Sequence, residues 1–408
     1  MADWNRRSVL STGIALSTSG LLASFGTAAA QSTDEQPMVQ EAVEWSSHGG
    51  TPGNTRYIPS SDDFEQLETV AWQYDGAGNV VVNDGTVYLQ TAEEVHAIDA
   101  DDGTTLWTST DGYADRAPAV AHNTVYVTGE ELTAIDAESG SVDWRTPLGS
   151  DALVSAPLVV FETVYVIVDG VLRAFDAANG SLRWEHESIT VTSRADDDPI
   201  EASYVCNPKT TAIAASADTL WALLDKRRSE VTIDADGIVA LDPLTGSIRL
   251  AEHLDPGNYA DSLMVTEDTI YLGQTSNEQT LECDPSTAEP TPHSSNTLTP
   301  AVNETQVVTQ GRHGLESSGE NASWEKDGTY SYGPPTIVGD TVIVAYSVHG
   351  SSTSDEVVAF DLNDGSEKWR FTFDETQWRD ALDVECIVDG DVVYVCRGDE
   401  LTAICPAR

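Results

Sequence analysis

Side chains that could carry catalysis or bind a metal are scattered through this 408-residue chain. Its eight histidines and five cysteines lack the close spacing of a zinc site, a CxxC redox pair or a haem-attachment motif. The sequence contains no HExxH motif and no serine on a G-x-S-x-G turn. Asp234 and Asp236 resemble the start of a calcium loop, but Pro243 stands where that loop needs a glutamate. We therefore predict no catalytic residue set and no bound metal.

One cationic cluster stands out in a chain with 68 acidic and 20 basic residues. Lys226, Arg227 and Arg228 follow one another in what we expect to be an exposed hairpin. They could dock an acidic partner. They could also pair with the neighbouring Asp225 and Glu230, as surface charges of opposite sign often do. The sequence leaves both interpretations open.

Aromatic residues recur just before an aspartate where several strand units are expected to begin. Tyr113, Tyr259 and Trp378 each precede an Asp by two residues, and Tyr332 is similarly placed. Such rings could line a binding mouth for a sugar, a quinone or a peptide, because they bring a large contact area with few torsions to freeze. Alternatively, they could pack the first strand of each unit.

An internal repeat supplies the elements that would position these residues. In five segments an Asp stands four residues before a Gly and eight before a large apolar residue, and a β-branched strand pattern precedes each segment. The Asp should accept hydrogen bonds from the turn that the Gly allows, and the Trp should pack between neighbouring units. The five sets are Asp99, Gly103 and Trp107; Asp136, Gly140 and Trp144; Asp176, Gly180 and Trp184; Asp242, Gly246 and Leu250; and Asp361, Gly365 and Trp369.

One such unit has four short strands and cannot bury both of its faces alone, so units of this kind stack around an axis. Degenerate copies around Asp284 and Trp324 fill the gaps, and the last copy stops at Cys405 without its fourth strand. Residues 69–74 have the character of the missing strand, and pairing there would seal an open edge. We therefore predict an all-β fold: an eight-bladed β-propeller of four-stranded antiparallel blades over residues 69–408, closed by an N-terminal strand.

The Ala-x-Asp-x-x-x-Gly-x-x-x-Trp repeat resembles that of the pyrroloquinoline-quinone (PQQ) enzymes and of BamB-like β-barrel assembly factors, which are both eight-bladed. The segment Trp45–Pro59 also looks like the opening of such proteins. By this resemblance, a dehydrogenase would show an adjacent cysteine pair, a calcium held by acid and amide side chains, and a catalytic Asp. The cysteine pair is absent from the sequence, and no carboxylate stands out as a base.

We therefore expect a binding or assembly scaffold without catalysis and without a cofactor, with PQQ and calcium kept as alternatives. The other functions considered are a PQQ-dependent dehydrogenase and an extracellular protein that binds a small ligand or a glycan. Insertions at 187–203, 224–236 and 347–355 should all lie on the face that carries the links between blades. Because binding residues tend to lie on loops held by a rigid frame, we expect the binding surface there.

The first thirty residues predict export. A twin-arginine pattern at residues 5–10, an apolar stretch and small residues at 28–30 indicate a signal peptide over 1–30, followed by a lead segment over 31–68. The formal net charge of −48 is typical of proteins that stay soluble in multimolar salt, which indicates a haloarchaeal type. We expect an extracellular or cell-surface monomer whose partner is an envelope or secreted protein, with no transmembrane anchor and no nucleic acid.

Five cysteines are an odd number for an exported chain, so at least one should be unpaired within the monomer. We expect mostly free thiols that pack as small apolar residues. A two-residue turn at Asp389-Gly390 would pair residue 386 with residue 393, which keeps Cys386 and Cys396 apart.

Overall fold

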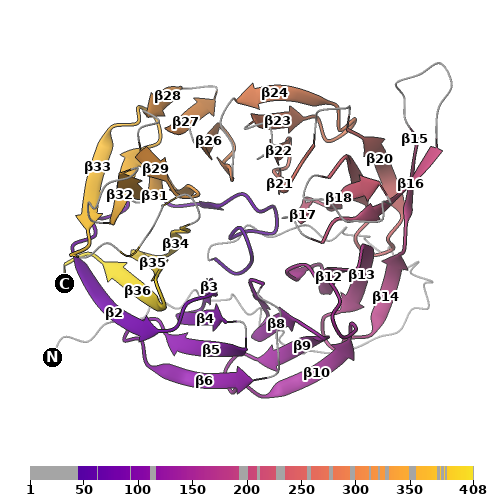
Figure 1. The fold of residues 1–408 in the computed structure, drawn as a ribbon, viewed down its shortest axis with the longest axis horizontal. Coiled ribbons are helices and arrows are strands. Elements are labelled where there is room, and N and C mark those ends of the chain that lie inside the picture. The colour runs from indigo at the N-terminus through magenta and orange to yellow at the C-terminus, as the bar shows by residue number, and fades with distance from the viewer. Residues whose placement is uncertain are drawn as a thin grey trace, which may run out of the picture. The chain divides into compact units, whose positions relative to one another are not determined.

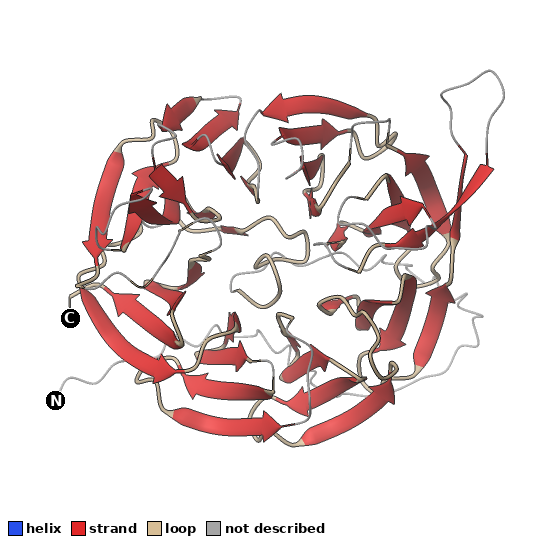
Figure 2. Cartoon of the chain, viewed as in Figure 1, coloured by secondary structure: helices blue, strands red, loops and turns tan. Residues whose placement is uncertain are grey.

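Eight β-sheets stand around a common centre like the blades of a propeller in the computed structural model (Figure 1). Every regular element among the described residues is a strand, and Figure 2 shows the strands joined only by loops and turns. The predicted all-β, eight-bladed propeller is confirmed. The structure describes residues 45–407 except 62, 92, 111–115, 193–200, 209–211, 227–234, 255–258, 275–278, 295–298, 312–313, 320–321, 327–329, 349–354, 375–376, 378–380 and 382–383. The predicted signal peptide lies outside the described residues.

The blades follow one another in chain order, each an antiparallel meander from the axis outward. The first four blades are β3 (Asn79–Asn83), β4 (Thr86–Gln90), β5 (Glu94–Asp99) and β6 (Thr105–Thr110); β7 (Ala119–Ala121), β8 (Thr124–Thr128), β9 (Glu131–Asp136) and β10 (Val142–Pro147); β11 (Leu158–Val160), β12 (Thr163–Val168), β13 (Val171–Asp176) and β14 (Leu182–His186); and β17 (Ile213–Ser216), β18 (Thr219–Lys226), β19 (Gly237–Leu241) and β20 (Ile248–His253).

The last four blades follow the same plan. They are β21 (Ser262–Val265), β22 (Ile270–Gln274), β23 (Gln279–Cys283) and β24 (Pro290–Ser294); β25 (Ala301–Val302), β26 (Gln306–Gly311), β27 (Gly314–Gly319) and β28 (Trp324–Lys326); β30 (Thr336–Val338), β31 (Thr341–Val348), β32 (Glu356–Asp361) and β33 (Glu367–Thr372); and β34 (Ile387–Asp389), β35 (Val392–Arg397), β36 (Glu400–Cys405) and β2 (Thr69–Asp75).

The repeat residues join each blade to the next. Five indole N–H groups donate to a backbone carbonyl in the turn of the following blade, over 2.8–3.1 Å. In that turn a glycine has a φ of +69° to +75°, and a Cβ on it would lie 2.4–2.7 Å from the neighbouring indole. Both the left-handed backbone and the close approach therefore require glycine. The pairs are Trp72 and Gly103, Trp107 and Gly140, Trp144 and Gly180, Trp184 and Gly246, and Trp324 and Gly365.

Each repeat aspartate holds the turn that follows it. Asp136 Oδ1 accepts from the backbone N–H of Ser139 at 2.8 Å, and Asp242 Oδ1 accepts from that of Thr245 at 2.9 Å. Equivalent bonds reach Asp99, Asp176 and Asp361. The hydroxyl of Ser139, together with the backbone N–H of the same residue, donates to the Asp136 carboxylate and holds the pKa of Asp136 below its ordinary value. The repeat thus forms an inter-blade joint, in which the aspartate holds the turn and the indole of the neighbouring blade packs against it.

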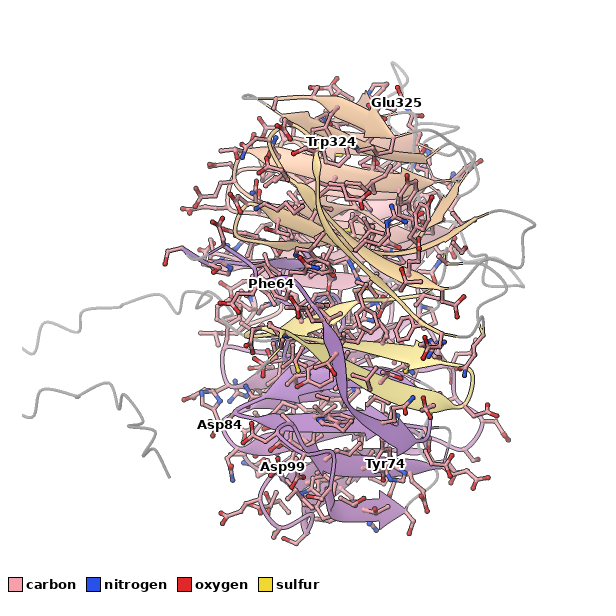
Figure 3. All side chains as sticks on the ribbon, turned by 90° about the vertical axis from the view of Figure 1, so that its left-hand side faces the viewer. Phe64, Tyr74, Asp84, Asp99, Trp324 and Glu325 are labelled. Carbon is pink, nitrogen blue, oxygen red and sulfur yellow. The ribbon has the colours of Figure 1, made fainter. Side chains whose placement is uncertain are left out.

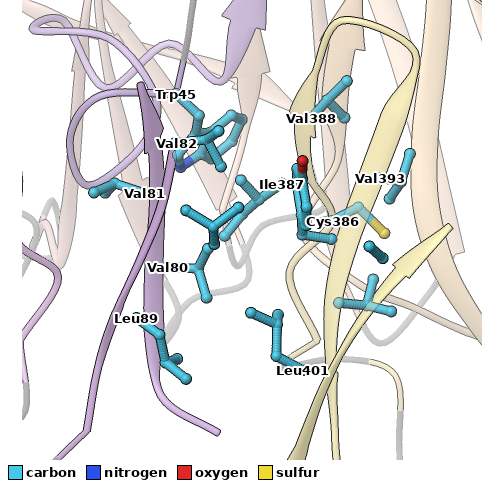
Figure 4. Close-up of a cluster of buried hydrophobic side chains, with 14 of the residues drawn as sticks. Trp45, Val80, Val81, Val82, Leu89, Cys386, Ile387, Val388, Val393 and Leu401 are labelled. Carbon is cyan, nitrogen blue, oxygen red and sulfur yellow. The ribbon is translucent and has the colours of Figure 1, made fainter. Parts of the chain in front are cut away.

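The N-terminal strand closes the ring as predicted. β2 pairs antiparallel with β36, from Thr69 opposite Cys405 to Asp75 opposite Glu400. Figure 4 shows the apolar side chains that fill the joint between this last blade and blade 1, with Trp45 among them. The last Trp of the ring, Trp369, meets Phe64 of the lead segment at 5.9 Å, where the final blade has no Asp–Gly turn.

Two details differ from the sequence prediction. The insertion at 187–203 contains a hairpin, β15 (Ile189–Thr192) and β16 (Glu201–Cys206), which extends the sheet of blade 4 through β18 instead of forming only a loop. In blade 8, Asp389 pairs with Val392, so the turn lies one residue later than predicted and residue 386 falls opposite 395. The pairing of 386 with 393 was wrong, because the turn begins at Gly390, whose φ is +57°.

All five cysteines are free thiols, and four of them are buried. Burial raises the pKa of Cys206, Cys283 and Cys386 to about 12, since the apolar surroundings disfavour a thiolate. These thiols therefore pack as small apolar side chains. No described helix is long and apolar enough to cross a membrane.

Candidate functional site

The lead segment runs through the centre of the ring (indigo in Figure 1). Its carbonyl oxygens accept hydrogen bonds from the innermost strands of blades 1, 2, 4, 5, 6 and 7, over 2.7–2.9 Å. Those strands are sheet edges, whose inward-facing N–H groups need partners. The donor and acceptor pairs are Val82 and Trp45, Val120 and Ser46, Ala215 and Pro52, Val265 and Gly53, Val302 and Thr55, and Ile337 and Arg56; β1 (Tyr57–Ile58) then pairs parallel with β30.

Tight turns allow the lead segment to fit there. A Cβ at Gly53 would lie 2.2 Å from the carbonyl oxygen of Val265, so only glycine lets the backbone approach this closely. Asn54 has a φ of +56° and is 4% exposed. Its side-chain amide donates to the carbonyls of Ile213 and Leu263 at 2.8 and 3.1 Å, which ties blade 4 to blade 5.

The two faces of the ring differ in what they carry. The short turns between strands one and two and between strands three and four lie on one face, here called the turn face. The blade links and the loops between strands two and three lie on the other, here called the loop face. Figure 3 shows Asp84 and Asp99 of blade 1 at the turn face, and Tyr74, in β2 of blade 8, toward the loop face. Hydrogen bonds from Val82, Val120 and Ala215, each just before a turn-face turn, hold the lead segment near that end of the axis.

A chamber of about 190 Å³ remains beside the lead segment, between the inner ends of blades 1 to 4. We call it the axial chamber. Residues that stand just before or at the start of an inner strand form its walls, so it lies toward the loop face. Its lining consists of Ser47, His48, Asn54, Asn79, Arg116, Ala117, Ser155, Ala156, Pro157, Leu158, Pro208, Ala212 and Ile213.

Cationic groups gather at this chamber in an otherwise acidic protein. Arg56, 1% exposed, donates from Nε to the Pro335 carbonyl and from Nη1 to Glu385 Oε1, both at 2.9 Å. Its guanidinium lies 4.9 Å from the centre of the Trp45 ring. Nη2 of Arg56 has no hydrogen-bond acceptor among the described residues. Arg116, in the chamber wall, donates from Nε to the Val154 carbonyl at 3.0 Å.

These charges shift the pKa values of their neighbours. Burial lowers the pKa of His48 below the ordinary 6.5, the charges of Arg56 and Arg116 lower it further, and Glu385 opposes them. Burial alone would raise the pKa of Glu385, but Arg56 and His48 more than offset this, so its pKa is lowered. At neutral pH the chamber wall thus carries the neutral imidazole of His48 and the guanidinium of Arg116, and the charges of Arg56 and Glu385 act on His48 from nearby.

The residues predicted to bind lie apart from this chamber. Tyr332 is 3% exposed, and its ring packs against Tyr346 and Phe360, because the extra strand β29 (Tyr330–Tyr332) joins the sheet of blade 7 through β31. It belongs to blade packing, the alternative that the sequence left open. Tyr259 is half-buried where blade 5 begins. Tyr113 and Trp378 lie outside the described residues.

Only one member of the predicted cationic cluster can be placed. Lys226 ends β18 on the loop face, with its Nζ 5.9 Å from the centre of the Tyr204 ring. The neighbouring Asp225 is 3% exposed and accepts from Asn207 at 3.1 Å. Arg227, Arg228 and Glu230 lie outside the described residues. The Asp225 carboxylate is thus bound to an amide, and both interpretations of the cluster, docking and ion pairing, stay open.

Sequence reasoning missed the axial residues. His48 and Arg56 lie in the lead segment, which was noted only as a resemblance, and Glu385 is more than three hundred positions from Arg56 in sequence. The available signal was the density of Gly49, Gly50 and Gly53 in a segment without strand periodicity, which indicates close backbone packing.

A family model supports the resemblance that the repeat suggested. The model of the outer membrane protein assembly factor BamB matches residues 91–263 and 200–407, most of the chain. The chain belongs to the BamB family. No curated protein sequence matches this BamB-family chain.

Solved structures share its fold at low identity. The quinohemoprotein alcohol dehydrogenase of Comamonas testosteroni has a TM-score of 0.60 and 14% identity, covering 91% of this chain and 82% of that one. BamB of Moraxella catarrhalis has a TM-score of 0.54 and 16% identity, covering 83% and 99%. The computationally designed Ika8 protein has a TM-score of 0.56 and 11% identity, covering 84% and 100%. At these identities the likeness establishes the propeller fold and nothing about activity.

Proposed function

We propose that this BamB-family propeller is an exported, salt-adapted scaffold that acts at the cell envelope by binding a protein partner through its loop face. Family membership supports a scaffold role. The ring supports it further, because the inter-blade joints and the axial lead segment tie the described strands of the blades to one another. The twin-arginine pattern and the acidic composition support the export and salt adaptation.

The distribution of charge carries the proposal. On the turn face, cations pair with repeat carboxylates: Arg183 with Asp176, and Arg249 with Asp242, at 2.8 and 2.9 Å. On the loop face, Arg370 pairs with Glu356 and Arg397 with Asp355, whereas the ammonium of Lys226 lies over an aromatic ring. Arg227 and Arg228 follow it directly in sequence. Three successive cations in a chain of net charge −48 favour an acidic segment of a partner over further copies of this chain.

The double variant Arg227→Glu/Arg228→Glu tests this surface. We expect it to capture its partner from envelope extract about tenfold less well, with an unchanged melting temperature, because rim charges govern association more than folding. Arg145→Glu/Arg173→Glu is the matched control, since it makes the same change in net charge on blade strands away from the hairpin. Equal recovery of partners by wild type and the hairpin variant would contradict the proposal.

A second candidate function is capture of a small organic anion in the axial chamber. The observation that favours it is the buried Arg56, with Nη2 lacking an acceptor among the described residues, near Arg116 and His48. Buried guanidinium groups normally satisfy their donors, and a carboxylate matches that geometry. A chamber of about 190 Å³ suits a small molecule.

Anion binding should strengthen as the pH falls from 7.5 toward 5.5, values set about one unit either side of the ordinary histidine pKa. The pKa of His48 is lowered in the free protein, so a bound anion would raise it and binding would take up a proton. Calorimetric titration with succinate in buffers of different ionisation enthalpy measures that proton. Arg116→Gln should weaken binding about tenfold or more, whereas a pH-independent affinity would contradict the role of His48.

The axial chamber does not support a PQQ-dependent dehydrogenase. Its volume of about 190 Å³ is below the roughly 300–1,000 Å³ usual for larger organic ligands. The nearby carboxylate of Glu385 is held by Arg56, and the described residues contain no group of three His, Cys, Asp or Glu side chains able to hold a metal. The axial chamber therefore suits a ligand smaller than a quinone. A second pocket, of about 610 Å³ between the lead segment and blades 4 to 6, has the volume for a larger ligand, so PQQ stays an alternative.

A further inference from the structure

The joint between blades 5 and 6 departs from the repeat. Pro292 stands in the place of the Trp, so no indole fills this joint. Gly319 pairs with Gln306 as Asp99 pairs with Thr86 in blade 1, which makes Ser318 the equivalent of the buried Ile98. By the same alignment, Glu282 precedes Asp284 by two residues and takes the place of the small Ala97. Two positions that are apolar in blade 1 thus carry polar side chains at one joint.

A histidine connects these two polar residues. His293 Nδ1 lies 2.9 Å from Glu282 Oε2, and His293 Nε2 lies 2.8 Å from Ser318 Oγ. An ionised carboxylate can only accept hydrogen bonds, so Nδ1 carries the proton and Nε2 is left to accept from the serine hydroxyl. This is the order of groups in which a carboxylate orients an imidazole that takes a proton from serine.

The strand geometry aims the histidine across the joint. In the ladder of β23 and β24, Leu281 pairs with Pro292 and Thr280 with Ser294, so His293 is the extra residue of a β-bulge. Bulges redirect a side chain. The ring of Tyr271 meets the imidazole edge-on, with the ring centres 5.6 Å apart, and fixes its orientation.

Another joint shows what a purely structural histidine does here. His186, on the outer strand of blade 3, bonds through Nε2 to the backbone carbonyl of Gly246 in blade 4 at 2.7 Å. It therefore cannot activate a hydroxyl. His293 occupies a comparable place in its blade but has a serine and a carboxylate as its two partners, which are the partners that a general base requires.

Solvent can reach the group. The side chain of His293 is 15% exposed and that of Glu282 is 44% exposed, and Ser318 is half-buried. The ladder of β27 with β28 ends at Ser317, whereas the ladder with β26 continues to Gly319. Successive residues of a strand direct their N–H groups to opposite sides. One of the N–H groups of Ser318 and Gly319 therefore points away from β26 and can donate to an oxyanion formed at Ser318.

We propose that Ser318, His293 and Glu282 form a hydrolytic site in which Ser318 is a nucleophile toward carboxylic esters with small acyl groups. Ser318 Oγ forms a bond to the ester carbonyl carbon while its proton passes to His293 Nε2. The bond from that carbon to the alkoxy oxygen breaks, and the alcohol leaves with the proton from His293. Water then attacks the acyl carbon and gives one proton to His293 Nε2. The bond from that carbon to Ser318 Oγ breaks, Oγ takes the proton back from His293, and the carboxylic acid leaves. The site does not depend on the proposed partner binding.

A fluorophosphonate probe, followed by peptide mass spectrometry of the wild-type protein in high salt, tests the nucleophile. We expect the phosphonyl group on Ser318. Ser318→Ala should abolish the labelling at this position and lower p-nitrophenyl acetate hydrolysis. His293→Gln should lower both labelling and hydrolysis about 10²-fold, the usual contribution of a general base. Ser294→Ala, on the same joint but bonded to Glu316, and His186→Gln should leave both unchanged. Labelling at another residue, or no labelling at all, would overturn the proposal whatever the folding of the variants.

Glu282 is a positioning residue, because it acts through the imidazole. Glu282→Gln keeps the size of the side chain and allows the histidine ring to adopt the other tautomer. We expect kcat for p-nitrophenyl acetate to fall about tenfold or more with an unchanged KM and melting temperature. A variant whose melting temperature falls while its kcat is unchanged would show that the three residues only join the blades.

Discussion

The Trp72→Ala variant should lose about 3–5 kcal/mol of unfolding free energy, as expected for truncating a buried tryptophan. The indole of Trp72 is 8% exposed, donates to the Ala100 carbonyl at 2.9 Å and covers Gly103. It also lies at the one joint where the ends of the ring meet. Removing it therefore leaves a cavity, an unpaired carbonyl and a weakened closure together. Denaturant unfolding at constant high salt measures the loss.

Trp107→Ala is the matched control for ring closure. Trp107 makes the same contacts with the Ala137 carbonyl and Gly140, but it joins blades that the chain connects directly. We expect the Trp72 variant to be less stable than the Trp107 variant and to expose β2 to hydrogen exchange first. If both variants lost the same unfolding free energy, the closing joint would contribute no more to stability than an ordinary joint. If neither variant lost any, the role given to the indoles would be contradicted.

Transfer into dilute buffer should unfold or loosen the protein, and added potassium chloride should restore it. Net charge is −48, and the few cations are shared among several carboxylates. The ammonium nitrogen of Lys368 lies 2.8 Å from a carboxylate oxygen of Asp340 and 3.8 Å from one of Asp361 and one of Asp63. One positive charge thus faces three carboxylates and cannot neutralise all of them. The screening length falls from about 10 Å at 0.1 M salt to about 3 Å at 1 M, which removes most of the repulsion between neighbouring carboxylates.

Melting temperatures measured across a potassium chloride series give the salt dependence. Sucrose is the control, because it strengthens burial without screening charge and should not substitute for the salt. A melting temperature that is the same in dilute buffer and in multimolar salt would contradict salt adaptation.

The blades were predictable because their signals are local. An Asp, a Gly and a Trp at fixed offsets describe one turn and one joint, and the contacts that form them lie within a single repeat and the next. Ring closure was predictable for a related reason: the last copy lacks a strand, and Thr69–Tyr74 has no unit of its own. The position of the turn in blade 8 could not be predicted in this way, because Asp389-Gly390-Asp391 allows two strand registers that differ by one residue.

The axial chamber could not be predicted in the same way. The lead segment binds the inner strands through backbone carbonyls, which every residue has. No pattern of side chains in the sequence therefore predicts its position on the axis. Arg56 and Glu385 meet only because the ring brings the two ends of the chain to one axis. Tyr332 was expected at a binding mouth because its spacing matched other blade entrances, but the extra strand β29 turns it into the core. Extra strands such as β29 do not stand at a constant distance from the repeat residues in the sequence, so the repeat does not predict where they occur.

From the path of the lead segment we also expect an order of folding. Residues 45–58 precede every blade in the chain, yet the N–H groups that hold them belong to inner strands from blade 1 to blade 7. β2 likewise has to wait for β36, at the opposite end of the sequence. Contacts between such distant segments close long loops and form slowly. We therefore expect the first part of the propeller to be synthesised to be among the last to be fixed in place. A chain that ends before blade 8 lacks β36, the partner of β2, and a shorter one also lacks some of the N–H groups that hold the lead segment.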